Sequence, residues 1–176
     1  ELSLLEQCKD LALKGLIEES KAELQEALKL ESMTPKLPLW FEPHGYQVKA
    51  YENWVARRRR GIFAMATGTG KTLTALYCTF RDFEIFNKYQ LLILVPSRIL
   101  VKQWADDCRN LNFSNLILVS SDYSDWRSRL SALTSALKFN SDRSFVVVAT
   151  YAALSRGTAL ASKLAQLPEA TMLIAD

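Results

Sequence analysis

The stretch MATGTGKT, residues 65–72, combines the residue types that bind a chain of phosphates. Gly68 and Gly70 allow the backbone to curl so that successive N–H groups point into one concavity. Lys71 can reach the β- and γ-phosphates of a nucleotide, and the hydroxyl of Thr72 can bind Mg²⁺. A helix that begins near Lys71 adds the positive end of its dipole. The predicted phosphate-binding residues are Thr67, Gly68, Thr69, Gly70, Lys71 and Thr72.

The residues on either side of this loop predict the elements that position it. The apolar run GIFAMA, residues 61–66, predicts a strand before the loop, and KTLTALYCTF, residues 71–80, predicts a helix after it. This order of strand, glycine-rich turn and helix is what a phosphate loop requires. Met65 stands where the usual pattern begins with Gly or Ala, but every phosphate-facing position is intact. The alternative is a surface loop that contains two glycines by chance.

A second chemical signal comes from MLIAD, residues 172–176, an apolar run that ends in an acid. Proteins with a phosphate loop use an Asp at such a strand end to hold Mg²⁺, directly or through water. Lys71 and Asp176 are therefore the candidate catalytic residues, and Thr72 and Asp176 are the candidate magnesium ligands. The alternative for Asp176 is a simple cap at the end of a strand.

The rest of the chain predicts an α/β fold. Residues 2–31 are rich in Leu, Glu, Lys and Ala and predict one or two helices broken near Gly15, before a linker at residues 34–38. Beyond the linker, helical patterns alternate with short runs that are apolar throughout, which indicates a parallel sheet covered by helices on both faces. These runs lie at residues 61–66, 91–95, 116–120, 145–149 and 171–175.

Composition narrows the class of protein. Hydrophobic residues make up 49% and charged residues 23%, and no apolar run is long enough to span a membrane. Three cysteines without metal-ligand spacing, Cys8, Cys78 and Cys108, and the absence of a secretory pattern favour a reduced, cytoplasmic location. Residues 1–39 hold five Lys and eight acids, a net charge of −3, whereas the remainder holds 17 cations and 11 acids, a net charge of +6. This basic body favours a polyanionic partner.

Five segments resemble, in this order, motifs of the first RecA-like domain of superfamily 2 DEAD/DEAH-type helicases and translocases. They are GYQ at 45–47, MATGTGKT at 65–72, LILVPSRILVKQW at 92–104, VVVATYAAL at 146–154 and LIAD at 173–176. The loop with Met first is similar to that of type I restriction motor subunits and related bacterial DEAD/DEAH proteins. The resemblance implies a RecA-like ATP-binding domain over residues 40–176, which ends within motif II. Residues 1–39 would be a helical segment and linker.

The resemblance implies ATP and Mg²⁺ as cofactors, with Gln47 reading adenine. A carboxamide suits that role because it can both donate and accept a hydrogen bond. Trp40 or Phe41 would stack on the base, or else pack beneath the sheet. His44 stands where the family more often has Leu or Arg, and we expect it to have a structural role.

The resemblance also implies a nucleic-acid partner, with DNA favoured over RNA. Ser97 and Arg98 fall in motif Ia, at a helix start that suits phosphate contact, although Ser97 would serve equally as a helix cap. Thr150 resembles the backbone-contacting Thr of motif Ic. The run RRRR, residues 57–60, is instead interpreted as a solvated helix end that offsets the helix dipole.

The expected activity is that of the ATP-binding motor domain of a nucleic-acid helicase or translocase, an enzyme in its parent protein. The 176 residues contain neither the acid that follows Asp176 in the family nor a second RecA-like domain, so we expect them to bind nucleotide and to be inactive alone. One alternative is the motor of a restriction or phage-defence nuclease. Another is a non-catalytic nucleic-acid-binding scaffold with a vestigial phosphate loop, and a small-molecule kinase is a weaker third.

Overall fold

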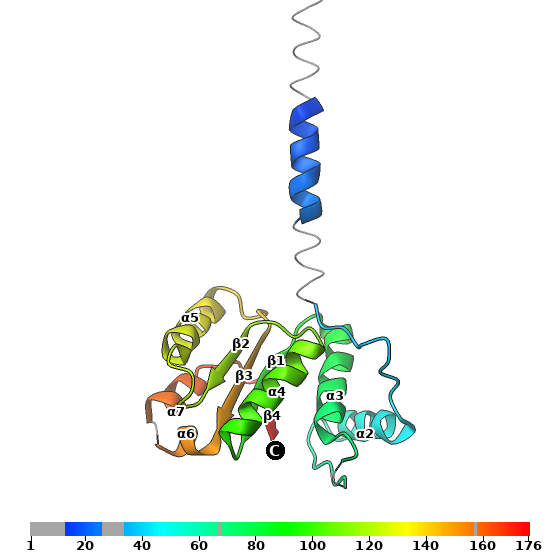
Figure 1. The fold of residues 1–176 in the computed structure, drawn as a ribbon, viewed down its shortest axis with the longest axis vertical. Coiled ribbons are helices and arrows are strands. Elements are labelled where there is room, and N and C mark those ends of the chain that lie inside the picture. The colour runs from blue at the N-terminus through cyan, green and yellow to red at the C-terminus, as the bar shows by residue number, and fades with distance from the viewer. Residues whose placement is uncertain (1–12, 26–33, 67, 157) are drawn as a thin grey trace, which may run out of the picture. The chain divides into compact units, whose positions relative to one another are not determined.

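A computed structural model describes residues 13–25, 34–66, 68–156 and 158–176. The chain divides into two units, Glu1–Thr34 and Pro35–Asp176. In the first unit, residues 13–25 form one continuous helix, blue in Figure 1. Of the two alternatives, one helix or a pair broken near Gly15, the described residues agree with one helix. A single glycine costs a helix only about 1 kcal/mol. The remainder of the expected helix, residues 2–12 and 26–31, lies outside the described residues.

The second unit contains a four-stranded sheet. Its strands are β1 (Gln90–Val95), β2 (Leu116–Val119), β3 (Phe145–Thr150) and β4 (Met172–Ala175). Their order is β2-β3-β1-β4, and every neighbouring pair is parallel. All residues of β2 and β3 are buried, as expected for strands that are apolar on both faces.

Helices cover both faces of this sheet (Figure 1). They are α2 (Gly45–Ala56), α3 (Lys71–Phe86), α4 (Arg98–Asn110), α5 (Trp126–Phe139), α6 (Tyr151–Arg156) and α7 (Thr158–Leu164). One core lies between the sheet and helices α3 and α4, and the other lies between the sheet and helices α5 and α7. The expected α/β fold is confirmed. No helix in the described part of the chain is long and apolar enough to cross a membrane.

Side-chain alternation along β1 explains how one strand serves both cores. Leu91, Ile93 and Val95 pack into the core beneath α3 and α4, whereas Leu94 packs into the core beneath α5. Successive side chains of a strand point to opposite faces, so a run that is apolar at every position can fill both layers.

The strand expected at residues 61–66 does not form, since these residues are described without helix or strand. The side chain of Ile62 is 93% exposed. A strand requires a backbone partner, and in the described part of the chain β4 pairs with β1 alone. The apolar composition of the segment predicted a strand, but composition does not show whether a partner strand is present.

The arginine run is exposed at the end of α2, as interpreted, but it forms a turn rather than the last residues of the helix. Helix α2 ends at Ala56, and Arg57 is its C-cap. Arg58 and Arg59 then adopt left-handed φ values of 56° and 59°. The run thus forms a turn after the helix, and the turn directs Arg59 back toward α3, where it is paired as described below.

Candidate nucleotide and nucleic-acid site

The predicted phosphate loop leads directly into α3, whose first residue is Lys71. Gly70 caps the helix with a φ of 78°, and Gly68 has a φ of 82°. Both angles lie in the left-handed region, which residues with a side chain rarely adopt. The two glycines therefore allow the loop to curl over the helix N-terminus. Thr67 lies outside the described residues.

Side-chain contacts hold the loop closed. Lys71 Nζ donates to the carbonyl oxygens of Met65 at 3.2 Å and Ala66 at 3.5 Å. Thr69 Oγ1 donates to Ala66 O at 2.7 Å, and Thr69 O accepts from Tyr46 Oη at 2.9 Å. The ammonium group thus lies on the loop itself, bonded to neutral carbonyls. A phosphate would be a stronger acceptor for it, because both partners would be charged.

Gln47 is joined to the same helix start. Its side chain is 2% exposed, its Nε2 donates to Thr74 Oγ1 at 3.1 Å, and its Oε1 accepts from His44 N at 3.0 Å. Thr74 Oγ1 in turn donates to Gly70 O at 3.0 Å. A carboxamide has a second N–H and a second lone pair, so hydrogen-bonding capacity remains. The adenine-reading role stays a prediction. Because the Gln47 side chain is buried, its surroundings must open before a base can reach it.

The aromatic residues near Gln47 fall into two environments. Phe41 is half-buried, with its ring centroid 6.0 Å from that of Tyr77 on α3. Trp40 meets Phe41 edge-on at 6.2 Å and is exposed. His44 stacks on Tyr46 at 5.4 Å, next to the loop. Of the two candidates for stacking on a base, Trp40 therefore has the free surface and Phe41 is packed.

A second group of predicted residues lies at the carboxyl edge of the sheet. Val95 of β1 is in register with Thr150 of β3, and Asp176 N donates to Leu94 O at 3.0 Å. Thr150 therefore ends β3, while Ser97 and Asp176 come just after the adjacent strands β1 and β4, so all three lie at one edge. The carboxyl ends of parallel strands are where open α/β sheets bind ligands.

Each of these edge residues has a hydrogen-bond partner. Ser97 Oγ accepts from Leu100 N at 3.3 Å, which is the helix-cap role left open by the sequence. Thr150 Oγ1 accepts from Ala153 N at 3.1 Å in the same way. Both hydroxyls keep a proton to donate, so phosphate contact stays a prediction for each.

Arg98 is exposed and paired with the end of β2. Its NH1 donates to Asp122 Oδ1 at 2.7 Å and to Ser121 Oγ at 3.2 Å. Exposed ion pairs contribute about 0–1 kcal/mol, so a phosphate can compete for this guanidinium at little cost.

Asp176 is held by two further side chains. Trp104 Nε1 on α4 donates to Asp176 Oδ2 at 2.9 Å, and Tyr151 Oη on α6 donates to Asp176 O at 3.2 Å. Trp104 is 2% exposed, whereas Asp176 is exposed. The carboxylate is thus exposed to solvent, while the buried indole of Trp104 sets its orientation.

The model of the family described as type III restriction enzyme, res subunit, matches residues 41–176. The chain belongs to this family. A similar solved structure is a nuclease-deletion mutant of the Type ISP restriction-modification enzyme LlaGI in complex with a DNA substrate mimic. The similarity has a TM-score of 0.60 and 26% identity over 77% of this chain, which corresponds to 15% of the LlaGI chain. No curated protein matches the chain.

As a res-subunit family member, the chain has the first RecA-like domain of a superfamily 2 helicase, and the predicted resemblance is confirmed. Members of such helicase families generally use ATP with Mg²⁺. The donors predicted here, the Thr72 hydroxyl and the Asp176 carboxylate, are the oxygen ligands that Mg²⁺ prefers. The described residues contain no group of three or more His, Cys, Asp or Glu that could hold a metal. Mg²⁺ generally keeps several waters and takes few protein ligands beside phosphates.

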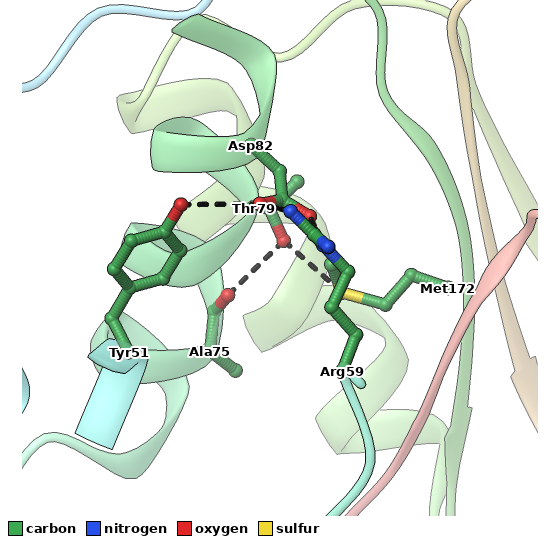
Figure 2. Close-up of polar contacts among 6 residues, drawn as sticks. All are labelled: Tyr51, Arg59, Ala75, Thr79, Asp82 and Met172. Atoms are coloured by element: carbon green, nitrogen blue, oxygen red, sulfur yellow. Dashed lines mark hydrogen bonds and ion pairs between the residues drawn. The ribbon is translucent and has the colours of Figure 1, made fainter. Parts of the chain in front are cut away.

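Sequence patterns did not single out the buried Asp82 of α3, which binds the arginine that precedes the segment entering the phosphate loop. Figure 2 shows its carboxylate between Arg59 and Tyr51. Arg59 Nε donates to Asp82 Oδ2 at 2.6 Å, while Arg59 NH2 and Tyr51 Oη donate to Asp82 Oδ1 at 3.1 and 3.2 Å. The signal in the sequence that could have revealed Asp82 is its helical spacing from Cys78 and Thr79, which places an acid on the buried face of α3.

The Asp82 contacts have electrostatic consequences. The hydrogen bond to Asp82 raises the pKa of Arg59, and burial, followed by the negative charge of Asp82, raises the pKa of Tyr51. The guanidinium carbon also lies 5.0 Å from the centre of the Phe86 ring. Since Arg59 and Lys71 are both fixed to α3, the intervening segment that enters the phosphate loop is anchored to one helix at both ends.

Proposed function

We propose that residues 40–176 are the ATP-binding first motor domain of a DNA-directed helicase or translocase of the restriction type. The observation that carries this proposal is the position of Ser97, Thr150 and Asp176 at one carboxyl edge of a sheet whose fold also presents a glycine loop at the start of α3. The complex of LlaGI with a DNA substrate mimic supports DNA over RNA as the partner.

Within this proposal, the loop amides and Lys71 bind the phosphates of ATP. Lys71 exchanges the carbonyls of Met65 and Ala66 for phosphate oxygens. Thr72 and Asp176 hold Mg²⁺, which neutralises charge on the transferred phosphate when it is bound. Gln47 selects adenine. Thr67 and Thr69 complete the phosphate-binding set.

Ser97, Arg98 and Thr150 bind the nucleic-acid backbone under the same proposal. Two of them present hydroxyls at helix starts, and Arg98 presents an exposed guanidinium. Backbone contacts of this kind position a strand without reading its sequence. They suit a motor that moves along DNA, and they make binding weaken as salt concentration rises.

The proposal includes a division of labour within a longer parent protein. The chain spans 15% of the LlaGI chain, so we infer that a second RecA-like domain completes the site. The loss of one transition-state group, such as an arginine finger, costs about 10³- to 10⁵-fold in rate. The 176 residues should therefore bind nucleotide with little turnover.

Calorimetric titration with ADP and Mg²⁺ tests the nucleotide site. We expect Lys71→Ala to weaken ADP binding by roughly 10- to 100-fold, because it removes a charge-assisted contact of about 1.5–3 kcal/mol. Lys102→Ala, on the exposed surface of α4, is the matched control and should bind as the unaltered chain does. Undetectable binding by the unaltered chain at millimolar ADP would overturn the proposal.

ADP binding distinguishes the motor domain from a scaffold, and phosphate release tests the proposed division of labour. A restriction or phage-defence motor is favoured by the LlaGI similarity and predicts the same nucleotide site. A scaffold with a vestigial loop predicts no ADP binding at all. Stimulated turnover at ordinary motor rates on addition of an oligonucleotide would show that the 176 residues form a complete site, and the proposed division of labour would be wrong.

A further inference from the structure

Trp104 lies on α4, seven residues after Ser97, which caps the start of that helix. Its ring is buried in the core beneath α3 and α4, and its Nε1 donates to Asp176 Oδ2 at 2.9 Å. An indole can only donate, and a buried indole N–H requires an acceptor. The carboxylate supplies that acceptor from a residue 72 positions later in the chain.

The carboxylate of Asp176 is thereby fixed more firmly than exposure alone would allow. Its backbone N–H bonds to Leu94 of β1, and its carbonyl accepts from Tyr151 of α6. These two bonds fix the main chain, while the bond from Trp104 fixes the side chain. Without the indole N–H, an exposed Asp would sample several rotamers.

We infer that Trp104 is a positioning residue for the magnesium-bound nucleotide, acting through Asp176. This inference rests on the proposed function, in which Asp176 holds Mg²⁺. Hydrogen bonds to a ligating carboxylate set its orientation, and their removal typically lowers metal affinity by about 10- to 100-fold. Trp104 bonds to Oδ2, so Oδ1 is the oxygen that would bind the ion or its water.

The connection also has consequences for nucleic-acid binding. Ser97 begins the helix that carries Trp104, and Tyr151 directly follows Thr150. Both elements proposed to contact DNA are therefore one hydrogen bond from Asp176. A movement of either element on DNA binding would reach the magnesium ligand without any intervening mobile segment.

The test compares ADP binding with Mg²⁺ and with EDTA. For the unaltered chain, Mg²⁺ should strengthen ADP binding, and Asp176→Asn should remove most of that gain. Trp104→Phe keeps an aromatic ring and removes only the N–H, so we expect it to reduce the gain about tenfold while leaving the affinity in EDTA within about twofold. A general loss of structure would weaken binding in both conditions alike.

Trp126→Phe is the matched control, because Trp126 is a half-buried tryptophan at the start of α5 against the opposite core. It should leave both affinities unchanged. In an Asp176→Asn background, Trp104→Phe should have no further effect on the magnesium gain. If Trp104→Phe keeps the full gain while Asp176→Asn loses it, the inference is wrong and the proposed function stands. If the unaltered chain shows no gain, the proposed function itself fails.

A spectroscopic measurement covers the case in which Trp104→Phe does not fold. In ¹⁵N-labelled protein, the indole N–H signal of Trp104 is assigned by its displacement in Asp176→Asn. That signal should shift when Mg²⁺ is added to the ADP-bound chain, and the Trp126 signal should not. An unmoved Trp104 signal at saturating Mg²⁺ would overturn the inference.

Discussion

The two halves of the candidate site are built by different means. At the sheet edge, Thr150 and Asp176 extend from paired strands, so backbone ladders and two buried cores set their positions. The described residues of the segment that enters the phosphate loop, 60–66 and 68–70, have no ladder. Phe63 packs against one core, and the side chains of Tyr46, Arg59 and Lys71 hold the rest. The stability of the sheet edge should therefore depend mainly on apolar packing, and the stability of the loop mainly on a few polar contacts.

The largest expected effect contrasts the same substitution in the two regions. Ile93→Ala in β1 removes a side chain with no exposed surface, and such truncations cost about 2–5 kcal/mol. Ile62→Ala, in the segment before the loop, should change the free energy of unfolding by less than about 0.5 kcal/mol. Urea denaturation measures both. Equal losses would mean that Ile62 is packed in solution, and the comparison would fail.

The next effect concerns the anchor of the loop segment. Asp82→Asn leaves Arg59 without its charged partner, and hydrogen bonds to charged groups contribute about 1.5–3 kcal/mol. The Arg59 side chain is 36% exposed, so solvent screening reduces the expected loss to about 1–2 kcal/mol. ADP affinity should fall as well, because the segment that enters the loop is released at one end.

The control for this variant is Glu84→Gln on the same helix. Glu84 pairs with Arg81 at 2.7 Å, with both side chains exposed. Its loss should cost at most about 0.5 kcal/mol and leave ADP affinity unchanged. If Glu84→Gln and Asp82→Asn lower ADP binding equally, the effect belongs to the charge of α3 rather than to the anchor.

Sequence patterns predicted the sheet side of the molecule better than the loop side. Runs that are apolar at every position become strands wherever a neighbour is available, which is why β1 to β4 were predictable. Residues 61–66 have the same composition, but whether a partner strand exists is a tertiary fact that composition does not contain. The ion pair of Arg59 was unpredictable for a related reason, since the acid that binds it lies 23 residues away.

The candidate site shows the same limit. Residue types and spacing predicted Lys71, Thr72 and Asp176 as site residues, because phosphate and magnesium chemistry demand those groups near a helix start and a strand end. The contacts that position them were not predictable. Trp104 reads from the sequence as one more apolar residue on a helix face, and only the register of β1 and β4 brings Asp176 to its N–H.

A third prediction concerns the shape of the loop. Gly70→Ala places a side chain at a φ of 78°, which costs about 1–2 kcal/mol, although the added Cβ would meet only Gln47 Nε2 at 3.6 Å and Leu73 Cβ at 3.9 Å. Gly61→Ala has open space and should be neutral or stabilising by at most about 1 kcal/mol. Thermal denaturation and ADP titration measure the pair. An unimpaired Gly70→Ala would show that the loop does not need this curl.

The smallest expected effect compares local opening of the two regions through their buried thiols. Burial raises the pKa of Cys78 on α3 and of Cys108 on α4 to about 12, so neither should react with a disulfide reagent at pH 8 until its surroundings open. Measured in a Cys8→Ser background, Cys78 should react roughly fivefold faster, a difference of about 1 kcal/mol in opening, because α3 continues into the weakly held loop. Bound ADP should slow Cys78 and leave Cys108 nearly unchanged. Identical rates for both thiols, with and without ADP, would mean that the two regions open together and that the sheet edge stabilises the loop as well.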